Sequence, residues 1–399
     1  MRLPYIPQWQ RNLYLISLGV FVASIAFSII TPFLPIFLMQ LGLKSNTSLW
    51  SGLVFSINSL AFGIMAPIWG SISDRYGKKP MMARAGLGMG LTYFLMAMVH
   101  NHIQLFVLRG INGLLSGYIP AAITLVAASS RPENLNYSLG IVQAASAIGN
   151  ITGPLVGGIT AKLLGIRGSM VFTGILLCIA AILPFAAKVK EEFVPKPKTS
   201  ILKDITATFQ NRQLVILYTV WLLIQAALMA IFPTLPLLIG SISKQNAELY
   251  TGIIFSIVGV STALGAPLVG RIRNYSTVNI FRWSLLACCA LTALQGLATS
   301  IFALGALRFL FGFFNSAVTV AGNVLIAKSS DQNNQGSSFG MLNSIMSIGL
   351  VSGPIIGGYL GDHLGLSYSF FGGAVLLLAA YILSIFIQEP EPGKLLHNR

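Results

Sequence analysis

Two arginines stand inside long apolar stretches, where an ionised side chain is costly. Arg109 and Arg308 each lie about 6–8 residues into such a stretch, roughly 9–12 Å from its nearer end at 1.5 Å per residue of helix. A central arginine costs about 2.5–3.5 kcal/mol in a membrane, so such residues are usually functional. The alternative is that the aliphatic stem carries the guanidinium to the nearer membrane surface. We expect Arg109 to serve function, and for Arg308 both interpretations stay open.

Carboxylates are the groups that could exchange protons inside the apolar stretches, because burial raises the pKa of a carboxyl toward neutrality. None of the ten acids lies in the middle of a stretch; they are Asp74, Glu133, Glu191, Glu192, Asp204, Glu248, Asp331, Asp362, Glu389 and Glu391. Proton exchange must therefore use a group near a stretch end or an arginine. The candidates are Arg109, Arg308, His102, Asp362, His363 and Asp74.

A charged turn follows the second apolar stretch. Its residues of interest are Gly70, Asp74, Arg75, Gly77, Lys78 and Lys79. Gly77 permits a tight turn, and Asp74 would be favoured beside the positive amino terminus of another helix. We expect Asp74 to form a latch. The alternative, a solvated turn, explains the lysines but not Asp74.

Glycines recur every four residues in the fifth apolar stretch. This segment contains Gly149, Gly153, Pro154, Gly157 and Gly158. Glycines four apart share one helix face, which lets another backbone approach closely, and the proline bends the helix. The alternative is ordinary close packing, and the two interpretations are compatible because a flat face can also slide.

The elements that position these residues must be membrane-spanning helices. The chain is 55% hydrophobic and 9% charged, against roughly 25% charged residues in soluble domains. A span needs about 20 apolar residues. Twelve are predicted: Leu13–Leu41, Leu49–Ile72, Met81–Val99, Ile103–Ala128, Tyr137–Leu164, Gly168–Ala187, Leu214–Ile239, Leu249–Arg271, Val278–Ala298, Ile301–Ala327, Ser338–His363 and Tyr368–Ile387.

The second half of the chain repeats the first. Residues offset by 200 positions match, among them Pro67 with Pro267, Gly149 with Gly349, Gly153 with Gly353, Pro154 with Pro354 and Gly157 with Gly357. A charged, proline-bearing segment, 188–213, separates the copies and ends in an amphipathic stretch typical of a surface helix. We therefore predict an all-α integral membrane protein with two pseudo-symmetric six-helix bundles, 1–187 and 214–399, joined by a cytoplasmic linker, 188–213.

The net charge of +15 is sorted by side rather than gathered into a nucleic-acid surface. With twelve spans, nineteen basic residues fall on the side of both termini and four on the other. This positive-inside bias predicts a multi-pass cell-membrane protein with cytoplasmic termini and no nucleic-acid partner.

The charged turn, the helix with Leu108-Arg109-Gly110-Ile111-Asn112-Gly113 and the glycine–proline segment together resemble the major facilitator superfamily. The resemblance covers the whole chain and is strongest to twelve-span drug–proton antiporters, particularly multidrug exporters of Gram-positive bacteria. It implies that Asp74 latches onto the eleventh span, near Gly336–Ser338, that Arg109 takes part in proton coupling, and that the glycine–proline motif favours export. The second copy lacks the latch, since Asn274 replaces Asp74.

The same resemblance implies one central cavity that opens alternately to either side. Its candidate lining is Ser24, Phe27, Asn58, Asn112, Tyr118, Gln143, Trp221, Gln225, Phe232, Phe313, Asn315, Asn323 and Asn343. Aromatic walls would bind varied amphipathic small molecules by contact area. The expected partners are such a substrate, protons and membrane lipids, with the protein a monomer of bacterial origin.

Proton-coupled multidrug efflux is therefore the expected function, and no cofactor or metal is expected. The lack of a mid-span acid puts proton coupling and cation preference in question, because unpaired arginines would favour neutral or anionic compounds. The alternatives are an exporter or flippase of a lipid, sugar or anionic metabolite, and an uptake carrier. An ion gradient is the expected energy source, because no P-loop is present. An enzyme is not expected, because neither a nucleophile with a paired base nor a His-Glu-x-x-His motif is present.

Overall fold

In the computed structural model the described residues, 7–130, 132–186, 211–271, 275–330 and 335–389, form helices and no strands. They divide into two compact units. Unit 1 comprises Met1–Lys196 and Ile239–Ser256, and unit 2 comprises Pro197–Leu238 and Ile257–Arg399. The predicted linker lies outside the described residues except for 211–213, so its surface helix stays a prediction.

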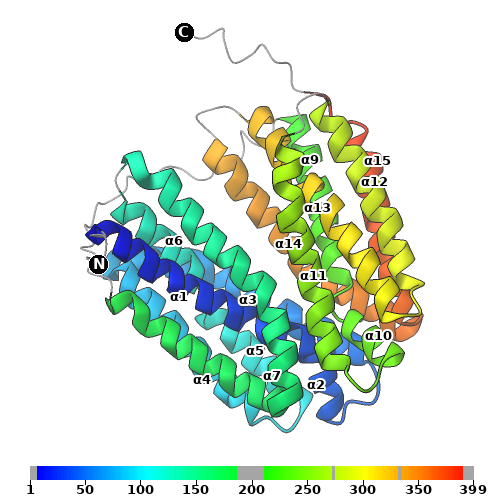
Figure 1. Cartoon of the computed structure of the whole chain (residues 1–399), viewed down its shortest axis with the longest axis horizontal. Helices are drawn as coiled ribbons and strands as arrows, with labels where there is room; N and C mark the ends of the chain where they lie inside the picture. Colours follow the sequence, from blue (N-terminus) through cyan, green and yellow to red (C-terminus); the bar gives the residue numbers. More distant parts are fainter. Residues whose placement is uncertain (1–6, 131, 187–210, 272–274, 331–334, 390–399) are drawn as a thin grey trace, which may run out of the picture. The chain divides into compact units, whose positions relative to one another are not determined.

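Unit 1 is built from antiparallel helices joined by short connections (Figure 1). Its elements are α1 (Gln8–Ile30), η1 (Thr31–Phe33), α2 (Leu34–Gln40), α3 (Thr47–Tyr76), α4 (Lys78–Ala97), α5 (His102–Leu115), α6 (Tyr118–Ser129), η2 (Pro132–Asn134) and α7 (Leu135–Ala186). Within α7 the backbone leaves helical geometry at Gly165, with φ 72° and ψ 169°. Since this positive φ favours glycine, Gly165 is where the chain turns between the predicted fifth and sixth spans.

Unit 2 repeats this plan with its own breaks. Its elements are α9 (Arg212–Ala230), α10 (Leu235–Ile242), α11 (Ala247–Gly270), α12 (Thr277–Gly296), α13 (Ile301–Ser329), α14 (Gln335–His363) and α15 (Leu366–Ser384). The end of α10 and the part of α11 up to Ser256 are assigned to unit 1.

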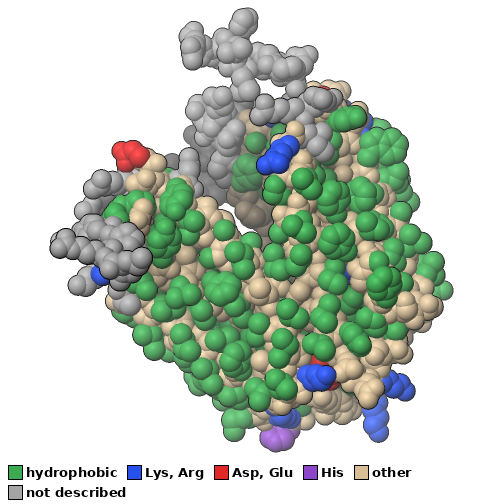
Figure 2. All heavy atoms as spheres, in the orientation of Figure 1, with side chains coloured by type: hydrophobic (Ala, Val, Ile, Leu, Met, Phe, Trp, Pro, Cys, Tyr) green, Lys and Arg blue, Asp and Glu red, His purple; other side chains and the backbone are tan. Residues whose placement is uncertain are grey.

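The helices have the length and composition of membrane spans. Ten described segments are long and apolar enough to cross a membrane, and one of them, Tyr137–Phe185, contains two predicted spans. Together with α4, whose first turns carry Lys78, Lys79 and Arg84, they account for the twelve predicted spans. Hydrophobic side chains cover the helix flanks in Figure 2, as expected for surfaces that face lipid.

Three predicted spans, the first, the fourth and the seventh, are interrupted rather than continuous. The seventh breaks between the end of α9 and the start of α10. The first span breaks at η1, where Pro32 and Pro35 cannot donate backbone hydrogen bonds. The fourth breaks between α5 and α6 at Ser116 and Gly117, and Gly117 has φ 123°. Its counterpart in unit 2, α13, runs unbroken from Ile301 to Ser329. The sequence repeat therefore predicts more structural similarity between the fourth and tenth spans than the structure has.

A residue of α12 caps the end of α15, and a residue that follows α15 caps the start of α12. Arg282 of α12 donates to the carbonyl oxygens of Ser384 (3.0 Å), Ile385 (2.9 Å) and Ile387 (2.7 Å) at the end of α15. The Glu389 carboxylate accepts from the Ser276 hydroxyl and from the Thr277 backbone N–H (3.0 Å) at the start of α12. Backbone groups without intrahelical partners are thus satisfied at both helix ends.

Candidate functional site

Arg109 is buried in unit 1 with 4% of its side chain exposed. It projects from α5, and its Nη1 lies 3.4 Å from the Tyr93 hydroxyl of α4. Its Nε has no hydrogen-bond partner, and no ion pair of Arg109 is found within the described part of the chain. The guanidinium is therefore a buried cation held by a neutral hydroxyl, with no acid from the described residues to neutralise it.

Three neutral side chains hold the helices around Arg109 together. Asn58 of α3 donates through Nδ2 to the Arg109 carbonyl oxygen (3.0 Å) and to Asn112 Oδ1 (3.2 Å). Asn112 donates through Nδ2 to Thr92 Oγ1 (2.6 Å) on α4. A Cβ on Gly113 would meet Ala61 Cβ at 2.9 Å, so only glycine lets α3 approach α5 this closely. The network fixes the backbone that carries Arg109.

Arg308 occupies the corresponding place in unit 2 but has less support. It is buried with 7% of its side chain exposed, and its Nε also has no partner. No ion pair or hydrogen bond of its guanidinium is found among the described residues. Both interpretations of Arg308, a functional role and extension to the membrane surface, stay predictions.

The glycine face on α7 lies against α1, as the sequence pattern predicts. A Cβ on Gly149 would lie 2.7 Å from the Phe21 carbonyl oxygen, and one on Gly153 2.8 Å from that of Ile25. Polar pairs flank the same contact: Ser24 with Ser146 (3.1 Å) and Ser28 with Asn150 (2.9 Å).

Gly157 lies against Ile29 on the same side, whereas the last glycine of the motif faces another way. Gly158 faces the Glu248–Gly252 segment of α11, which belongs to the same unit, and Glu248 O would lie 2.9 Å from its Cβ. The segment thus contacts two helices at once.

The second copy of the glycine face packs in the same manner inside unit 2. A Cβ on Gly349 would meet Leu222 O at 2.8 Å and Ala226 N at 2.9 Å, both on α9. Gly353 and Gly357 lie against the backbone of the following turns of α9, at Ala226 and Ala230. Both units therefore contain a backbone-to-backbone contact with no room for a methyl group.

The charged turn joins α3 to α4 through one residue. Gly77 ends α3, has φ 97°, and donates its N–H to Ser73 O (3.1 Å). Gly70 and Arg75 are exposed, and Lys78 and Lys79 are half-buried. Asp74 lies in α3, but its side chain is outside the described part of the structure. So are the side chains of Gln335–Ser337 at the start of α14, and the latch stays a proposal.

The predicted cavity residues fall into distinct environments. Ser24, Asn112, Tyr118 and Trp221 are buried within their own units; Phe27, Asn58, Gln225, Phe232, Phe313 and Asn315 are half-buried; Gln143, Asn323 and Asn343 are exposed. The Tyr118 hydroxyl donates to Ala180 O (2.6 Å), which ties α6 to α7. Of the predicted lining, the structure joins only Asn58 and Asn112 by a described hydrogen bond, and that bond supports Arg109.

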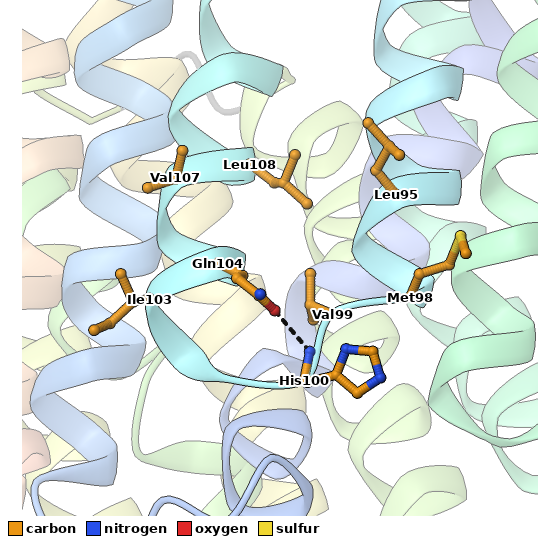
Figure 3. A pocket seen from close by; sticks show the side chains of 8 residues that line it. All are labelled: Leu95, Met98, Val99, His100, Ile103, Gln104, Val107 and Leu108. Carbon is orange, nitrogen blue, oxygen red and sulfur yellow. Dashed lines mark hydrogen bonds between the residues drawn. The ribbon is translucent and has the colours of Figure 1, made fainter.

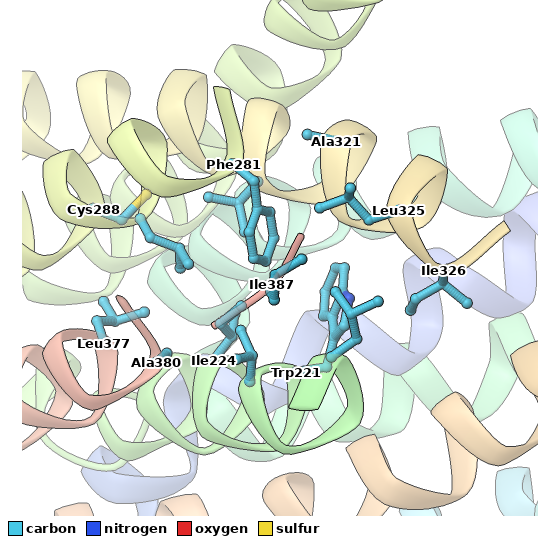
Figure 4. Close-up of a cluster of buried hydrophobic side chains, with 14 of the residues drawn as sticks. Trp221, Ile224, Phe281, Cys288, Ala321, Leu325, Ile326, Leu377, Ala380 and Ile387 are labelled. Carbon is cyan, nitrogen blue, oxygen red and sulfur yellow. The ribbon is translucent and has the colours of Figure 1, made fainter. Parts of the chain in front are cut away.

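Trp221 belongs to the apolar core of unit 2. It packs among Ile224, Phe281, Leu325 and Ile326 in the cluster shown in Figure 4. A Cβ on Gly322 would lie 2.8 Å from its ring. These contacts make Trp221 a packing residue of α9, α12 and α13.

The remaining proton-coupling candidates lie near helix ends. The His102 ring contacts the Trp50 ring edge-on, with centroids 4.5 Å apart. His363 stacks on Tyr359 at 4.1 Å, and its Nδ1 lies 3.0 Å from Tyr359 O. Asp362 is half-buried. None of the three is part of the Arg109 network.

The partners of Arg109 and Arg84 were not predicted from the sequence. Tyr93 lies at about the depth of Arg109 because α4 and α5 run antiparallel from a short connection, so counting outward from that connection could have found it. Arg84 was assigned only to the basic side of the membrane. It stacks on Trp69 at 3.5 Å and donates to Leu115 O (2.9 Å), which satisfies a carbonyl at the break after α5.

An apolar groove of about 440 Å³ runs between α4 and α5. Figure 3 shows its lining, which is Leu95, Met98, Val99, His100, Ile103, Gln104, Val107 and Leu108. Gln104 Oε1 accepts from the His100 backbone N–H (2.8 Å), so its polar groups bond to each other. No predicted cavity residue lines this groove, which is therefore separate from the predicted chamber.

Comparison with known families decides the class of the chain. The family described as Major Facilitator Superfamily matches residues 16–277 and again 229–398. The chain belongs to the major facilitator superfamily. The two matches cover both halves, in agreement with the internal repeat. Drug–proton antiporters of this superfamily are the type that the sequence motifs indicated.

Relatives in this superfamily extend over nearly the whole chain. A "Multidrug resistance protein MdtG" of Proteus mirabilis is 33% identical over 396 residues, which cover 96% of this chain and 97% of that protein. The protein of the same name from Salmonella paratyphi A is 34% identical over 383 residues, covering 94% and 95%.

Solved structures of major facilitator proteins share the fold. A bacterial homologue of the human lysosomal transporter Spinster, inward-facing and occupied, aligns with TM-score 0.80 at 14% identity over 97% of this chain and 98% of that one. The nucleoside transporter NupG aligns with TM-score 0.79 at 16% identity, over 94% and 97%. These identities establish the common architecture and no shared substrate.

Proposed function

We propose that this protein exports amphipathic small molecules by alternating access, driven by protons that move the opposite way. The observation that carries the proposal is the full-length similarity, 32–34%, to proteins named for multidrug resistance. The glycine–proline segment supports export. Its two faces, on α1 and on α11, allow backbones to slide without a side chain between them.

Arg109 is the proposed coupling residue. A buried guanidinium without an acid partner interacts strongly with any charge that approaches it. Substrate and proton can therefore compete through their interaction with this charge. The Asn58–Asn112–Thr92 network would keep the guanidinium in place during the cycle.

The termini are proposed to be cytoplasmic, because most basic residues then lie inside. In that orientation the turn with Asp74, Arg75, Lys78 and Lys79 faces the cytoplasm. There Asp74 would hold the two halves together while the cavity is open outward.

The test is transport by the purified full-length protein in liposomes. Ethidium inside the vesicles is followed by fluorescence while an imposed pH gradient supplies protons for exchange. We expect efflux that stops when a protonophore collapses the gradient, and none with Arg109→Gln. An ethidium efflux rate that is the same with and without the pH gradient would contradict proton coupling.

A second candidate, export of neutral or anionic compounds including lipids, is favoured by one observation. Arg109 and Arg308 are both buried without acid partners in the described part of the structure. The same liposomes loaded with a fluorescent organic anion or a labelled phospholipid separate the two functions. Transport of either, with no transport of ethidium, would favour this candidate.

A further inference from the structure

Unit 2 contains a group of buried polar atoms that have no partner. Thr292 and Gln295 on α12 are fully buried, and Thr292 Oγ1, Gln295 Oε1 and Gln295 Nε2 make no hydrogen bond. Arg308 on the neighbouring helix α13 is buried and its Nε is also unpartnered. An unpartnered buried polar group costs free energy, and a buried charge costs far more unless it is paired.

The matching hairpin of unit 1 shows what has changed. Both α4 and α12 have 20 residues, and α5 and α13 each begin five residues after the preceding helix ends, so the two hairpins align at an offset of 199. Arg308 then matches Arg109, and Thr292 matches Tyr93. In unit 1 the tyrosine hydroxyl reaches the arginine. In unit 2 the hydroxyl sits on a side chain shorter by a whole phenyl ring.

The other partners have changed as well. At this offset Leu291 and Phe311 replace Thr92 and Asn112, and both belong to the apolar cluster of unit 2. Gln295 replaces the apolar Met96. At the matching positions unit 2 therefore has the same arginine as unit 1, lacks the phenol and has an additional amide.

Helix geometry brings the three side chains to one depth. Side chains tilt toward the amino terminus of their own helix. Arg308 therefore extends back toward the connection between α12 and α13, whereas Gln295, close to that connection, extends away from it. Because α12 packs along α13, these directions favour a similar height for both heads, near that of Thr292. None of the three side chains bonds to another.

We propose that Arg308, Thr292 and Gln295 form a buried site for a small monovalent anion, such as a halide or a carboxylate group. Arginine N–H, threonine O–H and the glutamine amide N–H all donate to an anion, and one negative charge neutralises the guanidinium. Near-complete burial of the three side chains restricts the site to a small ligand. This site does not depend on the proposed transport function.

The test is direct binding of radiolabelled chloride to the purified full-length protein, by equilibrium dialysis with sodium gluconate holding ionic strength near about 0.15 M. We expect saturable binding to the wild type, and binding weakened by about tenfold or more in Arg308→Gln. Thr292→Tyr, which rebuilds the unit 1 contact, should lose binding equally. Lys244→Gln, a control that removes an exposed positive charge, should bind as the wild type does.

Thermal unfolding keeps the test decisive if a variant is unstable. Chloride in place of gluconate should raise the unfolding temperature of the wild type and of Lys244→Gln, but not that of Arg308→Gln or Thr292→Tyr. Displacement of chloride by acetate would show that the site also accepts carboxylates. Absence of saturable binding to the wild type, or equal binding by folded Arg308→Gln, would overturn the proposal and leave water as the occupant.

Discussion

Single buried side chains determine most of the chemistry available to this transporter. The Arg109 guanidinium contacts the Tyr93 phenol, and the Asn58 and Asn112 amides and the Thr92 hydroxyl hold the backbone that carries it; all four groups are neutral. Such a network fixes position while it leaves the charge free to respond to a proton or a substrate. A carboxylate partner would instead neutralise it permanently.

Replacement of Arg109 by glutamine should abolish gradient-driven efflux while the protein still folds, because the amide keeps polarity but carries no charge. We expect at least a hundredfold loss of initial rate, or about 3 kcal/mol. Proteoliposome transport, with size-exclusion chromatography as the folding control, measures this. Wild-type efflux in the folded variant would remove Arg109 from the mechanism.

Glu389 provides a prediction outside the membrane. Partial burial alone would raise the pKa of this carboxyl, but hydrogen bonds from Ser276, Thr277 and Val278 and the charge of Lys328 bring the pKa below its usual value. Stability from a lowered pKa is present above the unfolded-state value, about 4.3, and is lost as the pH falls through the folded-state pKa.

Glu389→Gln should therefore lower the free energy of unfolding at pH 7 modestly, by about 0.5 kcal/mol after solvent screening, and the unfolding temperature with it. The difference from the wild type should shrink below about pH 4. Thermal unfolding in detergent as a function of pH measures this. A difference that persists at low pH would mean that the amide loses more than charge.

At the scale of elements, the glycine faces set the distance between helices. The contacts of α7 with α1, and of α14 with α9, have backbone atoms where a side chain would normally stand. Their spacing is set by main-chain geometry rather than by side-chain rotamers.

Gly153→Ala and Gly349→Ala should each destabilise the protein and slow transport, because a methyl group there must push α1 or α9 away, at about 1–3 kcal/mol. Gly140→Ala and Gly340→Ala are matched controls on the same two helices, since nothing lies within 4 Å of a Cβ at either position. Thermal unfolding and efflux are compared across the four variants. Equal effects at all four positions would show that helix propensity, rather than contact, is responsible.

At the scale of the whole molecule, the proposed cycle requires contacts between the two halves to form and break as the cavity opens to one side and then to the other. Asp74→Asn, which removes the charge of the proposed latch, should slow turnover about tenfold or more while it leaves substrate affinity nearly unchanged. Tyr275→Phe, beside the residue that replaces Asp74 in the second copy, is a control with no charge change. Ethidium binding and efflux rates measure the two quantities separately, and an unchanged turnover would refute the latch.

Sequence alone was sufficient for the fold and for the environment of some residues. Apolar length predicted the twelve spans, and the glycine spacing predicted the contact face of α7. The break after α5 was not predicted, because it depends on Gly117 and on Arg84 reaching Leu115 O across helices. Trp221 was assigned to the cavity, whereas it packs in the unit 2 core, since aromatic type does not reveal which way a side chain points.

The mutual capping of α12 and α15 has a consequence for biogenesis. Arg282 leaves the ribosome about a hundred residues before the carbonyl groups it will satisfy. Until the last hydrophobic segment exits the translocon, lipid headgroups are the groups available to pair with that guanidinium. The ninth span therefore gains these partners only after the last span has been synthesised, so a nascent chain shortened before Ser384 should be a substrate for membrane quality-control proteases.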